Sequence, residues 1–102
     1  YRMLFEAWLP FYETCVESAD PYALHKTLLR IMCDLDDTNI VYRTSLATML
    51  QVKEESKQLL QSFSIMGLET MNSKFMRCNI SPGGSADMLS LVVFLYSVLR
   101  KQ

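Results

Sequence analysis

The feature that most constrains the fold of this chain is the scarcity of residues that interrupt a helix. The 102 residues include three glycines and three prolines, and two of the glycines are adjacent. Glycine and proline are the strongest local breaks in regular structure, so few turns are expected. Apolar residues recur at helical spacing, and the alternation typical of strands is nearly absent. The sequence therefore predicts an all-α protein, in which the β-prone run Ile40–Tyr42 would find no partner strand.

The apolar pattern predicts a bundle of about five helices in a single helical domain, residues 1–102. Pro10 should kink or interrupt the first helix because it lacks a backbone donor. Asp20 and Pro21 suit the N-cap and first position of the second helix. The last helix is apolar on nearly every side, so it is expected to be central in the bundle. The helices are expected at residues 1–18, 20–35, 44–63, 68–77 and 85–100.

Composition limits the class of protein and its surroundings. Half of the residues are hydrophobic and 21% are charged, which is typical of a globular chain rather than a disordered one. A chain this short buries a small share of its surface, so part of its apolar surface is expected to meet another segment or subunit. The formal charge of −1 argues against a broad face for nucleic acid.

Cysteine usage and hydropathy bear on the cellular compartment. The three cysteines are odd in number and have no CxxC spacing, so neither a disulfide framework nor a zinc site is expected. Reduced thiols favour a cytoplasmic protein. The most apolar stretch, residues 88–99, is too short to span a bilayer, so no membrane partner is expected.

The turn Ser-Pro-Gly-Gly-Ser-Ala-Asp at residues 81–87 is the first place where chemistry could reside. Adjacent glycines let the backbone bend sharply, and the exposed amides that open a helix attract anions. Ser85 can cap that helix, and Asp87 could complement the dipole or hold a cation bound to phosphate. The alternative is a turn followed by a helix cap, with no ligand.

An acidic connector, residues 34–39, is the second place. Carboxylates near a helix C-terminus oppose the macrodipole, so something should offset them. Asp37 could cap the following segment, Arg43 could pair with a carboxylate, or a divalent cation could lie between the carboxylates. A solvated acidic loop is the remaining alternative. The connector and its neighbour supply Asp34, Asp36, Asp37, Asn39 and Arg43.

Together the two segments resemble one family, the triphosphoribosyl-dephospho-CoA synthases. Residues 28–43 resemble the family's Leu-Asp-Asp-Thr-Asn…Arg stretch, and residues 77–89 resemble its Asn-x-Ser-Pro-Gly-Gly-Ser-Ala-Asp-Leu-Leu signature. The resemblance covers most of this chain but only the C-terminal part of the family's length. One departure is Thr44-Ser45, where the family usually has Gly-Gly.

The resemblance implies an all-α enzyme that transfers the triphosphoribosyl group of ATP to 3′-dephospho-CoA and releases adenine. The product is the prosthetic-group precursor for the acyl carrier of citrate lyase or malonate decarboxylase. It also implies Mg²⁺ with ATP, bound by Asp36, Asp37 and Asp87. The implied catalytic residues are Asp36, Asp37 and Asn39, and the implied substrate and phosphate ligands are Arg43, Ser81, Gly83, Gly84 and Ser85.

The same resemblance indicates a C-terminal fragment of a larger synthase. Its expected partners are ATP, 3′-dephospho-CoA, and the missing N-terminal half or another subunit, while assembly into a homo-oligomer is left open. The alternative is a non-catalytic helical interaction module, or a degenerate relative of the enzyme, that packs against a partner.

Overall fold

The computed structural model describes residues 2–100 and confirms the all-α prediction: these residues form no strand. A short π-helix, Leu4–Trp8, leads into six α-helices, one more than expected. The helices are α1 (Leu9–Glu17), α2 (Ala23–Asp34), α3 (Thr38–Arg43), α4 (Leu46–Gln61), α5 (Ile65–Arg77) and α6 (Gly83–Arg100).

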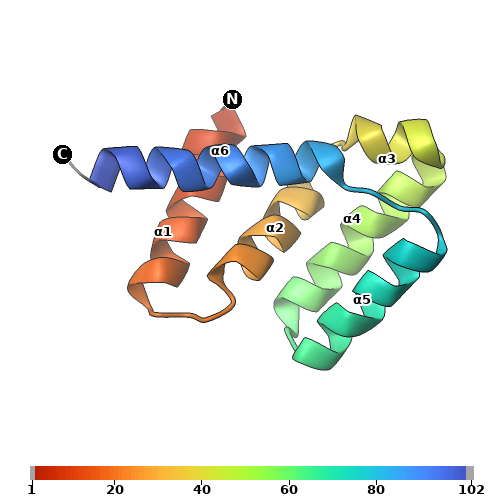
Figure 1. Cartoon of the computed structure of the whole chain (residues 1–102), viewed down its shortest axis with the longest axis horizontal. Helices are drawn as coiled ribbons and strands as arrows, with labels where there is room; N and C mark the ends of the chain where they lie inside the picture. The colour runs from red at the N-terminus through yellow and green to blue at the C-terminus, as the bar shows by residue number, and fades with distance from the viewer. Residues whose placement is uncertain (1, 101–102) are drawn as a thin grey trace.

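Residues 2–100 form two helical hairpins, the short helix α3 between them and a last helix that crosses the first hairpin (Figure 1). Helices α1 and α2 form the first hairpin, α4 and α5 form the second, and α2 packs against α4. Helix α6 crosses α1 and α2, and its N-terminal end lies beside the short helix α3. The chain returns from α5 to the start of α6, so both segments that carry the family resemblance come to the same end of the molecule.

The core consists of two apolar clusters that meet on α2. Ile31 belongs to the cluster between α1, α2 and α6, whereas Met32 belongs to the cluster between α2, α3 and α4. Adjacent residues of one helix thus face two different sets of neighbours. The buried members of the first cluster are Leu4, Trp8, Leu9, Ile31 and Val92, and those of the second are Met32, Ile40, Met49, Val52 and Ile80.

The predicted interruption near Pro10 is present as a change of helix type. Leu9 donates its amide to the carbonyl of Leu4, which gives the i→i+5 bonding of a π-helix. Pro10 then occupies the first turn of α1, where its missing amide proton costs little.

Helix α2 begins at Ala23, slightly later than predicted, although Asp20 still organises its entry. The side chain of Asp20 accepts a hydrogen bond from the Tyr22 amide at 2.8 Å and pairs with Lys26 at 2.7 Å.

The run Ile40–Tyr42 is helical, which the sequence did not lead us to expect. Asp37 is the N-cap of α3, and its carboxylate accepts from the amides of Asn39 and Ile40. A capped first turn and the burial of Ile40 in the second core cluster outweigh the β propensity of the run. The hypothesis that Asp37 caps the segment after the connector is therefore confirmed.

The position of α6 differs from the central one that was predicted. Ser85 and Val92 are its only buried residues, while Phe94 is 61% exposed. One face of α6 packs on the first core cluster, and the opposite face has no neighbour within residues 2–100. By length and mean hydropathy (1.2) this helix could cross a membrane, and 11% of it is buried. An apolar helix thus has its N-terminal turn packed against α3 and much of its length open.

Candidate substrate site at the junction of helices α3 and α6

The buried carboxylate of Asp37 is the centre of this junction, and only 2% of the residue is exposed. As the N-cap of α3, it accepts hydrogen bonds on Oδ1 from the amides of Asn39 at 3.0 Å and Ile40 at 3.4 Å. These amides belong to the first helical turn, and the Ile40 amide also donates to the backbone carbonyl of Asp37 at 3.1 Å. The local sequence therefore accounts for two of the five hydrogen bonds that the Asp37 carboxylate accepts.

The other three hydrogen bonds come from α6, which begins nearly fifty residues later. The Gly84 amide donates to Oδ1 of Asp37 at 3.3 Å. Ser85 donates to Oδ2 twice, from its amide at 2.9 Å and from its hydroxyl at 2.8 Å. One carboxylate thus caps the N-termini of two helices, and the positive ends of both helix dipoles face its charge.

The two adjacent glycines permit this close approach. A Cβ atom on Gly84 would lie 3.0 Å from Oδ1 of Asp37, and one on Gly83 would lie 2.8 Å from Nδ2 of Asn39. Neither glycine has a positive φ, so the expected sharp bend is absent. A side chain at Gly83 would displace the side-chain amide of Asn39, and one at Gly84 would displace the carboxylate of Asp37. Glycine at both positions thus lets these two side chains approach the backbone of α6.

Asn39 fastens the turn that precedes α6. Its Nδ2 donates to the carbonyl of Ser81 at 2.7 Å. At the other end of the turn, Asn79 takes the left-handed conformation (φ 55°) that ends α5, and the Ile80 amide returns to the Phe75 carbonyl at 2.9 Å. Ile80 is thereby buried in the second core cluster. The turn is held from both sides, so the N-terminus of α6 is placed accurately.

These contacts change what the predicted residues can do. The amides of Gly84 and Ser85, which were expected to cradle phosphate, already donate to Asp37. An ionised carboxylate has about four lone-pair positions, and Asp37 faces five donors, so it does not fit a metal site. In this arrangement Asp37 and Ser85 hold α3 and α6 together.

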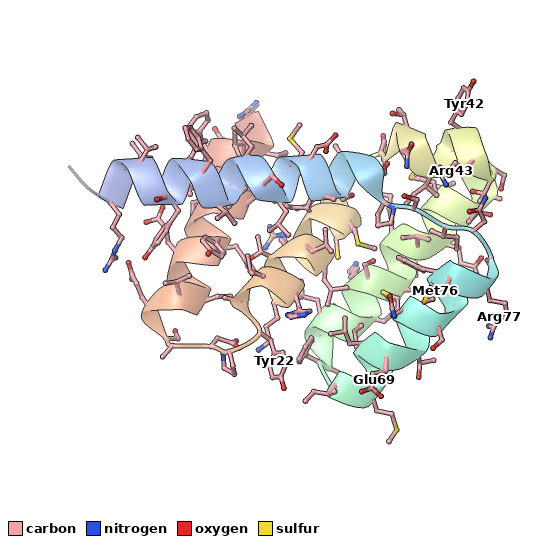
Figure 2. All side chains as sticks on the ribbon, viewed as in Figure 1. Tyr22, Tyr42, Arg43, Glu69, Met76 and Arg77 are labelled. Atoms are coloured by element: carbon pink, nitrogen blue, oxygen red, sulfur yellow. The ribbon has the colours of Figure 1, made fainter. Side chains whose placement is uncertain are left out.

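Other predicted residues lie on its surface. The side chain of Asp36 is 75% exposed and pairs with Lys53 of α4. Arg43 is exposed at the end of α3 (Figure 2), and Asp87 is exposed in the first turns of α6. These three charged side chains are available to a ligand in solution. Among residues 2–100, no three His, Cys, Asp or Glu side chains come together as a metal-binding group.

Two connector interactions escaped the sequence. Asp34 accepts from Trp8 Nε1 and from Arg30 Nε, each at 3.0 Å, so it joins the π-helix to α2 and is half-buried. Lys53 lies in the polar middle of α4, and its ammonium reaches Asp36 in the connector. The pair of Arg30 and Asp34 has the local i,i+4 spacing of a helix, whereas the partners in the other two pairs are 26 and 17 residues apart and have no local signal.

The sequence comparisons agree on one family. The model of the ATP:dephospho-CoA triphosphoribosyl transferase family matches residues 1–102. The chain belongs to this family.

Relatives in several bacteria have matching names. The chain is 31% identical to the probable 2-(5''-triphosphoribosyl)-3'-dephosphocoenzyme-A synthase of Vibrio cholerae, over 96% of this chain and 34% of that protein. It is 37% identical to the protein of that name, numbered 1, in Salmonella typhimurium, over 85% of this chain and 32% of the relative. A relative in Malonomonas rubra is 38% identical over 69% of this chain and 24% of its own length. No solved structure matches.

The chain thus spans between a quarter and a third of the length of these relatives. Within this chain, the two segments that resemble the family meet at the bonds between Asp37 and Ser85. The departure at Thr44-Ser45 also has a local explanation. Ser45 is the N-cap of α4, and its hydroxyl accepts from the Thr48 amide at 3.1 Å. Serine at this position caps α4 with its side chain, which glycine could not do, and its backbone is less flexible than that of glycine.

Proposed function

We propose that this chain is the C-terminal part of an enzyme that transfers the triphosphoribosyl group of ATP to 3′-dephospho-CoA. The ribosyl carbon of ATP forms a bond to the 2′-hydroxyl of dephospho-CoA, and its bond to adenine breaks. The match of the family model along residues 1–102 supports the proposal. The observation that carries it is the meeting of both family segments at one buried carboxylate, Asp37.

The chemistry requires stabilisation of a positively charged ribosyl centre and of a triphosphate. Breaking a bond from a ribosyl carbon to a leaving group passes through a state like an oxocarbenium ion, which a nearby carboxylate stabilises. Asp36 is the exposed carboxylate of the connector and is proposed for this role, with Asn39 positioning the turn. Asp37 is proposed to act only by holding α3 and α6 together.

Arg43 is proposed to bind the triphosphate, because an exposed guanidinium forms two parallel hydrogen bonds to phosphate oxygens. Mg²⁺ is expected with ATP, and it would neutralise charge on the phosphates. It usually takes one or two protein carboxylates and several waters. Asp36 and Asp87 are the exposed carboxylates proposed to approach it, whereas the saturated carboxylate of Asp37 is not.

The partners in this proposal are ATP, 3′-dephospho-CoA and the remaining part of a family protein, because the relatives are about three times as long. A cytoplasmic location is proposed from the free thiols of Cys15, Cys33 and Cys78. The alternative of a non-catalytic helical module is less favoured, because both family segments are present and the family model matches along the whole chain.

Release of adenine tests the proposal. This chain would be co-expressed with the remaining two thirds of the Salmonella typhimurium relative, and the purified mixture would be given ATP, Mg²⁺ and 3′-dephospho-CoA. We expect adenine and the triphosphoribosylated product in equal amounts, measured by liquid chromatography with mass detection. No adenine from the mixture, when the relative's own C-terminal third restores release, would contradict the proposal.

The variant Arg43→Ala should reduce the rate of adenine release by roughly tenfold to a hundredfold. This range follows from the loss of a charge-assisted hydrogen bond of about 1.5–3 kcal/mol. Arg100→Ala is the matched control, because Arg100 is an exposed arginine at the opposite end of α6. Equal rates for the two variants would remove Arg43 from the phosphate site.

A further inference from the structure

An apolar groove runs between α2 and α5, and no part of the proposed reaction uses it. Its volume is about 290 Å³. His25 is its only ionisable side chain, and its other walls are aliphatic, aromatic, thioether or small polar groups. The lining residues are His25, Leu28, Leu29, Met32, Leu68, Met71, Asn72, Phe75, Met76, Ile80, Ser81 and Pro82.

Helix α5 forms one wall of this groove. None of its thirteen residues is buried. Met71 and Phe75 pack against the second core cluster from one side, and both line the groove. Met76 stands at the rim with 76% exposure and is labelled in Figure 2. An amphipathic helix is stabilised mainly by the packing of its apolar face, and α5 has no buried residue. The groove beside α5 therefore has room for one more helix in the bundle.

The shape and chemistry of the groove favour a helix over a small molecule. Ligand sites usually enclose about 300–1,000 Å³ and contain a few converging polar groups. This groove is at the lower limit of that range, and three of its twelve lining residues have polar side chains, His25, Asn72 and Ser81. Its wall on α5 extends from Leu68 to Met76, about 12 Å at 1.5 Å per residue, or two helical turns. Two turns of an amphipathic helix present two or three large apolar side chains to such a groove.

We infer that this groove receives an amphipathic helix from the part of the family's proteins that this chain does not span. The inference rests on the proposed function, because the occupant is the remainder of a triphosphoribosyl transferase. That remainder is about two thirds of each matched relative and is long enough to supply such a helix. Ser81 and Pro82 line one end of the groove, and Asn39 holds Ser81. The docked helix therefore contacts the turn that places the N-terminus of α6.

A pair of methionines on α5 provides the test. Met76 lines the groove, whereas Met66 is 78% exposed on the same helix and does not. This chain would be co-expressed with the remaining two thirds of the Salmonella typhimurium relative, and the complex would be measured by gel filtration with light scattering. We expect a 1:1 complex. Met76→Glu should weaken it at least about tenfold, because a carboxylate in an apolar interface loses hydration, and Met66→Glu should change it less than about twofold.

Oxidation of methionine by hydrogen peroxide gives a second measurement without substitutions. In this chain alone, Met66 and Met76 should oxidise at similar rates because they are similarly exposed. In the complex, Met76 should be protected at least about tenfold while Met66 is unchanged. Neither measurement requires adenine release. If the mixture released no adenine but Met76 were protected, the docking of a helix in the groove would be supported although the proposed function had failed.

Three results would overturn the inference. The first concerns the complex with the remaining two thirds of the relative. Either Met76→Glu and Met66→Glu leave this complex equally intact, or this chain forms no complex while the relative's own C-terminal third binds the same remainder. The second is self-association of this chain that Met76→Glu abolishes, which would make a second copy the occupant. The third is binding of 3′-dephospho-CoA to the chain alone that Met76→Glu abolishes while assembly persists, which would make the groove a ligand site.

Discussion

Replacement of Asp37 by alanine should destabilise the chain far more than replacement of its neighbour Asp36. The buried carboxylate of Asp37 accepts five hydrogen bonds, and four of them come from amides in the first turns of α3 and α6. Loss of an N-cap costs about 1 kcal/mol for each helix. The hydroxyl of Ser85, which is buried, would also lose its partner, at about 1–3 kcal/mol. The sum predicts a loss of about 3–5 kcal/mol.

Urea unfolding followed by circular dichroism measures this loss. Asp36→Ala is the matched control, because its carboxylate is exposed and its pair with Lys53 should contribute about 0–1 kcal/mol. Ser85→Ala removes one donor and should cost about 1 kcal/mol. The double variant of Asp37 and Ser85 should be less destabilised than the sum of the single variants, because the two side chains share a bond.

A stability of Asp37→Ala within about 0.5 kcal/mol of the wild type would refute this account. Such a result is expected of a carboxylate kept for chemistry or for metal binding, because its removal relieves an unfavourable charge. If the alanine variant does not fold, the milder Ser85→Ala and the Asp36→Ala control still measure the junction. Additive effects of Asp37 and Ser85 would show that the bond between them contributes nothing.

Two further predictions concern other parts of the chain. Ala19 has a left-handed backbone (φ 54°) after α1, so Ala19→Gly should raise the free energy of unfolding by about 1 kcal/mol, and an unchanged urea midpoint would contradict this. Burial raises the pKa of the thiols of Cys15 and Cys33, whereas Cys78 is exposed. At pH 7.5 iodoacetamide should therefore alkylate Cys78 first, and the other two should react faster as pH rises; equal rates, measured by mass spectrometry of peptides, would exclude this ordering.

Part of the candidate site could be predicted from the sequence, because that part is local. A cap involves residues two or three positions apart, so the interaction of Asp37 with Asn39 and Ile40 was among the expected alternatives. The resemblance to the family also brought residues 28–43 and 77–89 into one hypothesis. Arg43→Ala tests the proposed role of Arg43, and the roles of Asp36 and Asp87 stay predictions.

The three hydrogen bonds that Asp37 accepts from α6 lay beyond that local range. The bond from Ser85 joins residues 48 positions apart, and no periodicity in either segment encodes it. Gly83 and Gly84 were expected to bend the chain, yet their role is to let Asn39 and Asp37 approach the backbone. The sequence shows that Gly83 and Gly84 have no side chain. Only the tertiary structure shows that Asn39 and Asp37 occupy the space beside them.

The sequence by itself determined that the described chain is helical and where most of its helices begin and end. Helical bonds and caps link residues within about one turn, so spacing and capping residues predict them. Only the tertiary structure decided which faces are covered. Helix α6 is apolar on nearly every side, so its pattern marks no single inner face, and it lies across α1 and α2 with much of its length open. Helix α5 has a clear apolar face, but the groove beside it is open because packing depends on neighbours that local spacing does not specify.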